Sequence, residues 1–321
     1  MVSEKSLKHT AEMTNSDINF SIIIPCYNAS MYIDRAINSA LAQRIGNYEI
    51  IVVDDGSTDT TDDILHAYVS TNKYRISFIR QENRGPAAAR NRGISESKGE
   101  YLLFLDADDE LLPDALQAFQ STLCEANFKY DFVYAGHYSV NIAGKTKKLC
   151  PVSREVNGPR EFKRLIEGKG VSPTHGAIVI RKRCFQKLSY PESIRCNEDF
   201  VLFAHLFALY SGRAISRPVV FKYKREGSLR GDTQAIIDAV TKAPALLFDP
   251  TVLPDEYFKF KPLYVAKRYL EKARINFKNR EFSEFRKTYH QSIEAYPRTI
   301  FKHRFLIRYL YAIAWLAFNH N

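Results

Sequence analysis

The first hundred residues predict an α/β fold with a doubly wound, mostly parallel sheet. Short runs of apolar and β-branched residues, typical of buried parallel strands, alternate with stretches whose apolar residues recur at helical spacing. Ligands bind beyond the carboxyl ends of the strands in sheets of this kind. The predicted strands are 20–25, 48–53, 75–79 and 101–105, and the predicted helices between them are 31–43, 60–69 and 87–95.

Three carboxylates directly follow the predicted strand 101–105. Asp106 and Asp108 are two residues apart, so at a strand end they project to the same side, and Asp109 adds a third charge. Carboxylates this close repel one another unless they are neutralised, and hard oxygen ligands suit Mg²⁺ or Mn²⁺. Such an ion usually keeps waters and a substrate diphosphate as its other ligands.

Two other interpretations fit the same carboxylates. One is an acidic loop that caps the helix predicted to start near Pro113. The other is an aspartyl-phosphate hydrolase with Asp106 as the nucleophile. That hydrolase pattern usually continues with a small hydroxyl or branched residue and a Gly, so the residues that follow Asp108 weaken this interpretation.

Polar side chains also follow two other predicted strands. Tyr27 and Asn28 come after the first strand, and Asp54 and Asp55 come after the second. Because the carboxyl ends of parallel strands lie at one edge of the sheet, these clusters and the acidic run are expected to converge on one site. No Gly-x-Gly-x-x-Gly follows the first strand and no P-loop motif is present, so a diphosphate would be held by metal and basic residues.

Composition and charge narrow the class of protein. The 321 residues are 45% hydrophobic and 26% charged, which is ordinary for a globular protein of one or two domains. An odd number of Cys, five, without a Cys-x-x-Cys pair favours a reducing compartment over a disulfide framework or zinc site. Residues 1–19 are polar, which predicts a disordered leader and not a signal peptide, and no apolar run reaches membrane-span length.

Four segments together resemble the nucleotide-binding half of the inverting family 2 glycosyltransferases, which have the GT-A fold. Each segment is weak evidence alone, but they occur in the family's order and at its spacing across 20–119. The segments are Ile-Ile-Pro-Cys-Tyr-Asn at 23–28, Ile-Val-Val-Asp-Asp-Gly-Ser-Thr-Asp at 51–59, Glu-Asn-Arg-Gly-Pro-Ala-Ala-Ala-Arg-Asn-Arg-Gly at 82–93, and Phe-Leu-Asp-Ala-Asp-Asp at 104–109.

The resemblance implies roles for particular residues. Asp55 would read a uracil-type base, and Asp54 would support that pocket. Asp106 and Asp108 match the family's Asp-x-Asp motif, which implies Mn²⁺ or Mg²⁺ with Asp108 as the preferred direct ligand. The other residues implied to line the nucleotide or diphosphate site are Pro25, Tyr27, Asn28, Arg84, Arg90 and Asn91.

The second half of the predicted domain carries two further motifs. Glu198 and Asp199 open an apolar-rich helix at 201–210, where acids in the first turn would simply suit the helix dipole. They also resemble the family's Glu-Asp motif, which implies Asp199 as the base for the acceptor hydroxyl with Glu198 in support, although which acid does this work stays open. Arg225 and Ser228 resemble the family's loop that closes over the diphosphate, and a solvated surface loop is the alternative. A lone His, His175, is more often structural than part of a sugar site.

The C-terminal region carries the whole charge excess. From 259 to 321 there are fourteen Lys and Arg against four Glu, which equals the net charge of +10 of the entire chain. Residues 241–254 contain three Pro and are interpreted as a connector, and 256–277, 281–296 and 299–318 are predicted to be helical. Interleaved aromatic and basic residues favour an anionic membrane surface for 256–321, with a helical bundle on the catalytic domain as the alternative. Nothing besides charge supports nucleic acid, so none is expected.

Together these features predict a leader at 1–19, a GT-A domain at 20–240 and a C-terminal helical region at 241–321. The nucleotide half of the domain would be 20–119 and the acceptor half 120–240. The predicted function is inverting, metal-dependent transfer of a hexosyl or N-acetylhexosaminyl group from a nucleotide-diphosphate donor, a UDP-sugar above all. The acceptor would be a glycan or lipid-linked hydroxyl in cell-surface polysaccharide biosynthesis.

The same features bear on processivity, location and the alternatives. The only Trp, Trp315, lies outside a Gln-x-x-Arg-Trp pattern, which favours single transfer over polymer synthesis. The expected location is cytoplasmic, peripheral on the inner face of the membrane. The alternatives are the phosphohydrolase above and a non-catalytic glycan- or membrane-binding module.

Overall fold

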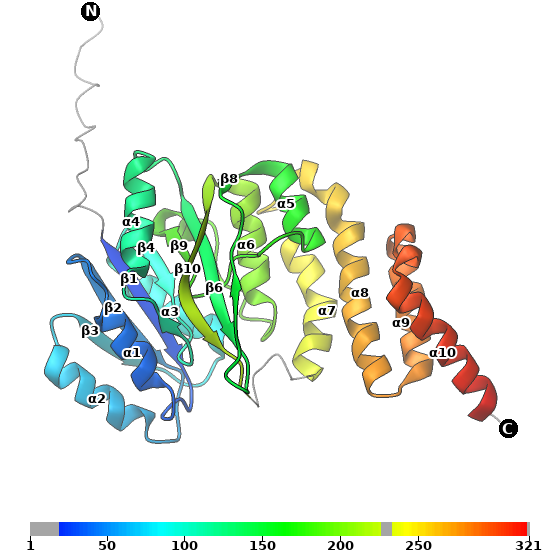
Figure 1. Cartoon of the computed structure of the whole chain (residues 1–321), viewed down its shortest axis with the longest axis horizontal. Helices are drawn as coiled ribbons and strands as arrows, with labels where there is room; N and C mark the ends of the chain where they lie inside the picture. Colours follow the sequence, from blue (N-terminus) through cyan, green and yellow to red (C-terminus); the bar gives the residue numbers. More distant parts are fainter. Residues whose placement is uncertain (1–18, 226–232, 320–321) are drawn as a thin grey trace, which may run out of the picture. The chain divides into compact units, whose positions relative to one another are not determined.

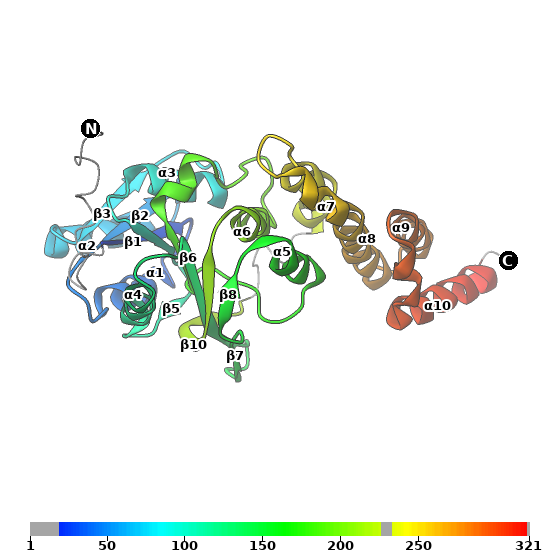
Figure 2. The same ribbon diagram turned by 90° about the horizontal axis from the view of Figure 1, so that it is seen from above.

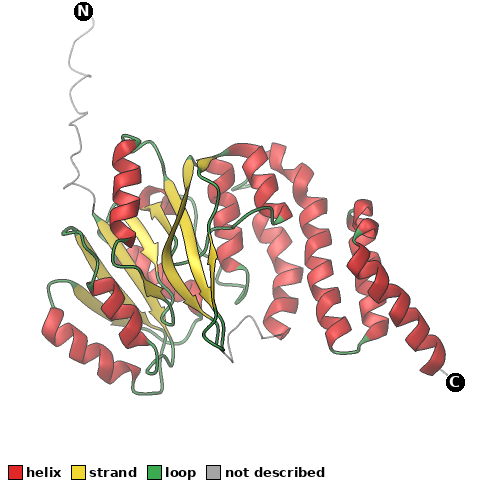
Figure 3. Cartoon of the chain, viewed as in Figure 1, coloured by secondary structure: helices red, strands yellow, loops and turns green. Residues whose placement is uncertain are grey.

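The computed structural model describes residues 19–225 and 233–319, and its described residues include a ten-stranded mixed sheet flanked by helices (Figures 1 and 3). The order along the sheet is β3-β2-β1-β4-β9-β6-β10-β5, with β7 beside β6 and β8 beside β10. The strands are β1 (Phe20–Cys26), β2 (Tyr48–Asp54), β3 (Ile76–Arg80), β4 (Tyr101–Phe104), β5 (Glu110–Leu111), β6 (Phe132–Val140), β7 (Thr146–Leu149), β8 (Arg154–Val156), β9 (Ile178–Arg181) and β10 (Gly212–Tyr223).

The predicted parallel core of four strands is confirmed. β1 pairs in parallel with β2 on one side and β4 on the other, and β2 pairs in parallel with β3. Every residue of β1 and β4 is buried, as expected for apolar runs covered on both faces. The helices between these strands are α1 (Ile33–Leu41), α2 (Thr61–Asn72) and α3 (Pro86–Glu96), and α4 (Ala115–Glu125) follows β5.

A close contact fixes α3 on the sheet. Gly93 lies against β1, where an added Cβ would meet Ile23 Cγ2 at 2.3 Å. Only a residue without a side chain fits there, which keeps the start of α3 and the residues around Arg90 close to the carboxyl ends of β1 and β4.

The second half of the sheet is antiparallel where it meets the first. β9 pairs antiparallel with both β4 and β6, and β10 runs parallel to β6. The stretch 141–170 contains β7, β8 and the helix α5 (Gly158–Glu167). Its strands are short and mostly polar, so their composition resembles that of a loop.

The chain forms two compact units that alternate along the sequence. The first comprises the residues through Val156, Pro173–Ser189 and Tyr210–Arg225, and it contains the sheet. The second comprises Asn157–Ser172, Tyr190–Leu209 and the residues from Glu226 onward. The domain boundaries at 120 and 241 stay predictions, since the units are defined by contacts and interleave in sequence.

The second unit is helical. Its described helices are α5, α6 (Glu198–Leu209), α7 (Thr233–Leu247), α8 (Lys261–Lys278), α9 (Phe282–Ala295) and α10 (His303–Asn319), with 3₁₀ turns η3 (Asp255–Phe260) and η4 (Pro297–Phe301). The three C-terminal helices are confirmed, whereas the predicted connector at 241–254 is wrong in its first part, because α7 continues through Pro244 to Leu247. Within the described residues, no helix combines the length and the apolarity needed to cross a bilayer.

Candidate active site

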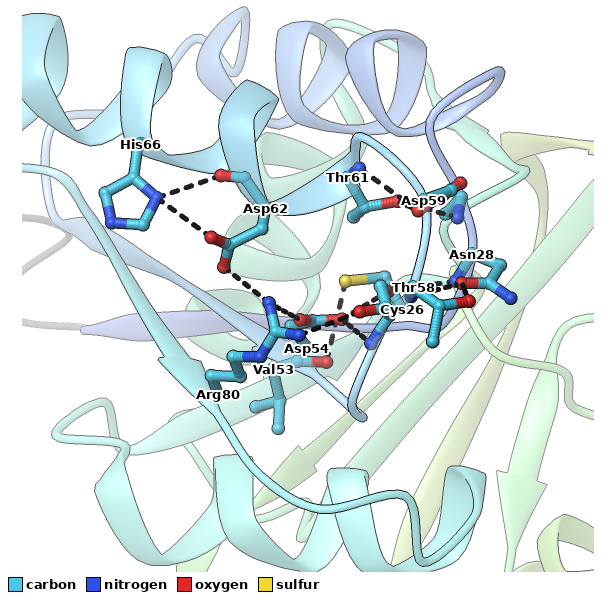
Figure 4. Close-up of polar contacts among 12 residues, drawn as sticks. Cys26, Asn28, Val53, Asp54, Thr58, Asp59, Thr61, Asp62, His66 and Arg80 are labelled. Carbon is cyan, nitrogen blue, oxygen red and sulfur yellow. Dashed lines mark hydrogen bonds and ion pairs between the residues drawn. The ribbon is translucent and has the colours of Figure 1, made fainter.

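Asp54 lies at the end of β2 and is completely buried. Its Oδ1 accepts a hydrogen bond from the backbone N–H of Ser57 at 3.1 Å and another from the Ser57 hydroxyl. Arg80 NH1 lies 3.4 Å from the other oxygen of Asp54 and also pairs with Asp62 at 2.9 Å (Figure 4). These contacts direct Asp54 into the loop that follows β2, where it holds the turn in place.

Asn28 links the ends of β1 and β2. Its backbone has φ +47°, a left-handed conformation that Asn tolerates better than most residues. The Asn28 side-chain oxygen accepts from the N–H of Thr58 at 2.8 Å, and the Asn28 N–H donates to Ser57 Oγ at 2.9 Å (Figure 4). The neighbouring Tyr27 is half exposed and Pro25 is buried within β1, so a ligand can reach Tyr27 and the exposed Asn28 but not the side chain of Pro25.

Asp55 points the other way from Asp54, toward the loop before α3. Its carboxylate accepts from the N–H groups of Arg84 at 2.9 Å and Gly85 at 2.7 Å, and from Gln81 Nε2 at 2.8 Å. The backbone of Gly85 has φ +92°, which only Gly adopts easily, and α3 begins directly after it. Asp55 therefore brings Arg84 and the start of α3 to the carboxyl end of β2.

Asp106 is surrounded by basic side chains from three other segments. Arg90 of α3 lies 2.9 Å from Oδ1, Nδ1 of His175 lies 3.5 Å from the same oxygen, and Lys222 of β10 lies 3.2 Å from Oδ2. Burial alone would raise the pKa of Asp106, but Lys222, His175 and Arg90 hold it well below its ordinary value. Asp106 is thus a permanently charged centre at the edge of the sheet.

Asp109 shares Lys222 with Asp106. Its Oδ2 accepts from Lys222 Nζ, and its Oδ1 accepts from the N–H of Tyr223 at 3.1 Å. Burial raises the pKa of Asp109 to about 7, and the charges of Asp106 and Asp108 add to the rise while Lys222 opposes it. The pKa of Lys222 is raised, because the two carboxylates outweigh the opposite effect of its burial. Lys222 therefore stays protonated and fastens the acidic turn to β10.

Asp108 faces a different cation. Its Oδ2 forms an ion pair with Arg225 Nε at 2.6 Å, and its backbone oxygen accepts from Arg35 of α1. Arg35 in turn lies over the ring of Tyr223 at 3.8 Å, and Arg225 lies 5.0 Å from the ring centre of Tyr32. The Arg225 side chain is 40% exposed, whereas the basic side chains around Asp106 are 15% exposed or less, so the ion pair of Asp108 opens more easily than those of Asp106.

These residues could bind a divalent cation, but they provide only part of its coordination shell. The carboxylates of Asp106 and Asp108 are hard oxygen donors on one turn, and a cation would compete only with the openable Arg225 pair at Asp108. Among the described residues, including those of this site, no group of three or more His, Cys, Asp or Glu is arranged to hold a metal. A cation at Asp108 would need oxygens from water or a diphosphate, so the residues fit an ion that binds together with its substrate.

The remaining predicted site residues belong to three different segments. Glu198 and Asp199 form the first turn of α6 in the second compact unit, where Asp199 Oδ1 accepts from the N–H of Phe200 at 2.7 Å and Glu198 is buried. Asn197 just before them has φ +64°. Asn91 lies within α3 beside Arg90. Ser228 falls outside the described residues.

Sequence reasoning missed three side chains that build this site. Lys222, Arg35 and Gln81 contact the acidic turn or Asp55, yet none lies in a recognisable motif. A cation at 222, within the otherwise apolar and aromatic stretch 219–223, was the one available signal, because a Lys in a buried strand needs a carboxylate partner.

The fold and the site define a class of protein. A mixed α/β sheet with an Asp-x-Asp turn beyond β4, next to β1 where the strand order reverses, is the GT-A arrangement. The chain belongs to glycosyltransferase family 2, whose family model, described as "Glycosyl transferase family 2", matches residues 21–189.

Individual proteins resemble the chain over most of its length. An uncharacterised glycosyltransferase of Rickettsia conorii is 30% identical over 291 residues, which are 87% of this chain and 46% of the relative, so the chain spans less than half of that protein. The structure of S. aureus TarS 1–349 in complex with UDP-GlcNAc has a TM-score of 0.67 at 20% identity, covering 92% of this chain and 89% of that one. The mannosyltransferase PcManGT of Pyrobaculum calidifontis, in complex with GDP-Man and Mn²⁺, has a TM-score of 0.53 at 19% identity, covering 87% and 74%. At these identities the two structures show the shared fold.

Proposed function

We propose that this protein is a metal-dependent, inverting glycosyltransferase that moves one sugar from a UDP-sugar to an acceptor hydroxyl in glycan or polysaccharide biosynthesis. The observation that carries the proposal is the turn of Asp106 and Asp108, set among Arg90, Lys222 and Arg225 beyond the strand ends. Family membership supports sugar transfer, and the UDP-GlcNAc bound to the structurally similar TarS supports a UDP donor carrying a hexosyl or N-acetylhexosaminyl group.

The donor would bind along the ends of β1, β2 and β4. Asp55 would accept a hydrogen bond from the base, and half-exposed Tyr27 would pack against the nucleoside. Asp54 and Asn28 would act one step back, by holding the turn after β2 that presents Asp55. Arg84 and Arg90 would face the nucleotide or diphosphate from the start of α3.

The cation would be held by Asp108, with Asp106 nearby. Mn²⁺ or Mg²⁺ would neutralise the leaving diphosphate, and the Mn²⁺ in the PcManGT complex supports a divalent ion in this fold. When the ion takes Asp108, Arg225 would be released, and a freed guanidinium is suited to pair with a phosphate. Ser228 would join it.

The acceptor hydroxyl would be activated by Asp199, with Glu198 in support. Asp199 would take the hydroxyl proton while the acceptor oxygen bonds to the anomeric carbon and the bond from that carbon to the diphosphate breaks. The nucleoside diphosphate would leave with the bonding electron pair, and the configuration at the anomeric carbon would be inverted. We further propose that the protein acts peripherally on the inner face of a membrane, where a lipid-linked acceptor would be within reach.

No observation favours the phosphohydrolase alternative. Both oxygens of Asp106 are engaged by cationic side chains, so a role as free nucleophile would require those contacts to break. A non-catalytic module would bind the same ligands without turnover, so the test includes release of UDP from UDP-GlcNAc in the presence of a candidate acceptor.

Calorimetric titration of UDP with Mn²⁺, and again with EDTA, tests the donor site. We expect binding that needs the metal and that Asp108→Ala reduces at least about tenfold. Arg225→Ala should have opposite effects on the two ligands. Without nucleotide it should raise the affinity for Mn²⁺, because a cation that competes for Asp108 is removed. With Mn²⁺ present it should lower the affinity for UDP, because a guanidinium that could pair with a phosphate is lost. Lys224→Ala, an exposed neighbour, is the matched control. Absence of binding to UDP, GDP, dTDP and CMP alike would contradict the proposal.

A further inference from the structure

One side of α10 belongs to the core of the second unit. Phe305, Tyr309 and Leu316, which are four and seven residues apart, pack with buried Ala312 against α8 and α9. The hydroxyl oxygen of Tyr309 also lies 2.7 Å from Nε2 of His290 in α9, at hydrogen-bonding distance. α10 contacts α9, its neighbour in Figure 2. The helix is thus anchored, and its orientation within the unit is set.

The opposite side of α10 is apolar and exposed. Ile307 is 64% exposed and Leu310 is 60% exposed, and they lie on the side of the helix away from Tyr309 and Ala312. The other exposed large apolar side chains on α10 and the turn before it are Ile300, Phe301, Leu306, Tyr311, Ile313 and Trp315. Apart from the side that carries Arg304 and Arg308, α10 is apolar around its circumference, and apolar helix faces are normally covered.

The charges around this exposed face select its partner. Lys302 and Arg304 are exposed at its start, Arg298 precedes it, and no Asp or Glu follows Glu294 in the chain. A second copy docking through the same face would offer these cations no carboxylate partner, because residues 295–321 contain no Asp or Glu. An anionic lipid surface instead attracts the cations and takes up the apolar side chains.

We propose that the exposed face of α10 is a membrane-docking surface that lies in the plane of an anionic bilayer, with Ile307 and Leu310 inserted and Lys302 and Arg304 at the headgroups. Trp315 and Tyr311 carry amphipathic rings that suit the lipid–water boundary. This inference names the surface behind the peripheral membrane location given under the proposed function. It rests on that proposal only in assuming that the acceptor is lipid-linked. Docking would keep the enzyme at the surface that holds lipid-linked substrates.

Vesicle co-sedimentation of the full chain tests the surface. We compare binding to phosphatidylcholine vesicles that contain about 40% phosphatidylglycerol with binding to pure phosphatidylcholine vesicles, each at low and high salt. We expect strong binding to the anionic vesicles, weak binding to the neutral ones, and partial loss at high salt.

Matched variants separate the apolar and the charged contributions. Ile307→Asn with Leu310→Asn should weaken vesicle binding at least about tenfold, because two inserted side chains are lost. Lys302→Glu with Arg304→Glu should have a similar effect on anionic vesicles only. The control for the apolar pair is Ile142→Asn with Val152→Asn, which are equally exposed in the first unit, and it should bind as the wild type does.

The outcomes are distinct from those of the donor-site test. The α10 variants should keep metal-dependent UDP binding, so lost vesicle binding with intact UDP binding supports the docking surface. The inference is overturned if wild type and variants bind anionic vesicles equally, or if wild type does not bind them. It is also overturned if sedimentation equilibrium shows a dimer that the asparagine pair dissociates, because a second copy would then cover the face.

Discussion

Lys222 neutralises two carboxylates that would otherwise repel each other beside the Asp-x-Asp turn. Its Nζ contacts both Asp106 and Asp109, and its side chain is only 15% exposed. A largely buried cation with two anionic partners is a network in which each member depends on the others. Replacement of Lys222 leaves Asp109 without its cationic partner, although Asp106 keeps Arg90 and His175. Replacement of Asp109 leaves Lys222 paired with Asp106.

We therefore expect Lys222→Met to lower the free energy of unfolding by about 3–5 kcal/mol, the usual cost of removing one partner from a buried ion pair. Addition of Asp109→Asn should recover a large part of this loss, because it removes the carboxyl group that has lost its cationic partner. Urea unfolding in EDTA measures both effects, with the exposed Lys224→Met as control. A double variant no more stable than the single one would contradict this account.

The residues of the acidic turn differ in how far sequence could predict them. Asp106 and Asp108 follow an apolar strand directly, so local spacing sufficed to place them at the sheet edge. Lys222 lies 113 residues from Asp109, and their contact depends on where β10 lies in the sheet, which no local pattern encodes. Asp54 and Asp55 are adjacent and chemically equal, yet one holds a turn and the other holds the loop before α3, a difference that only three-dimensional structure reveals.

At the scale of elements, continuous apolar runs were predictable and short polar elements were not. β1, β2 and β4 are buried on both faces and carry the signal in their composition. β7 and β8 are stabilised by pairing with β6 and β10, and the sequence of either one alone resembles a loop. The prediction placed a Pro-containing connector over the second half of α7, although tertiary packing of its buried Ala and Val residues sustains the helix through Pro244.

The packing of α8 on α5 buries a Lys whose charge is disfavoured. Lys267 donates a hydrogen bond to the carbonyl oxygen of Ile166 at the end of α5. Burial lowers its pKa to about 8, and the nearby charges of Arg268 and Lys302 add to the effect. The unfolded chain, with the ordinary pKa near 10.5, therefore binds more protons than the folded chain between about pH 8 and pH 10.5.

Stability should accordingly rise with pH across that window. We expect the free energy of unfolding of the wild type, relative to Lys267→Met, to increase on the order of 1–2 kcal/mol from pH 7.5 to pH 10, after allowance for partial exposure. Urea titrations at both pH values measure the difference, and Lys287→Met, at an exposed position on α9, serves as control. Parallel pH profiles for wild type and Lys267→Met would show that Lys267 is not the group responsible.

At the scale of the whole molecule, the domain boundary suggested by composition differs from the division into compact units that the contacts define. Composition changes near 241, which suggested a separate C-terminal region. The contacts instead group α5 and α6, from the middle of the chain, with the C-terminal helices in one unit. Composition reports which residues are charged or apolar, but it carries no information about which distant helices they cover.

The aromatic contacts of the second unit turn this difference into a prediction. Phe162 of α5 packs edge-on against Tyr257, with ring centres 4.9 Å apart, and Phe200 of α6 stacks on Tyr264 at 5.6 Å. The Tyr257 hydroxyl donates to the carbonyl oxygen of Ala208 at 2.8 Å. A chain that ends at 240 would keep α5 and α6 but lose these partners, leaving large aromatic side chains exposed.

We expect the chain truncated after 240 to aggregate or to bind a hydrophobic dye strongly, with loss of a single cooperative unfolding transition. A chain truncated after 302 loses only α10 and should stay folded with a smaller loss of stability, because α8 and α9 still pack together. Circular dichroism, dye binding and urea unfolding of the two truncations measure this. If the 240-residue chain were instead a soluble monomer that unfolds cooperatively and binds UDP as the full chain does, the boundary suggested by composition would be the physical one. The interleaved unit would then be a description of contacts without energetic weight.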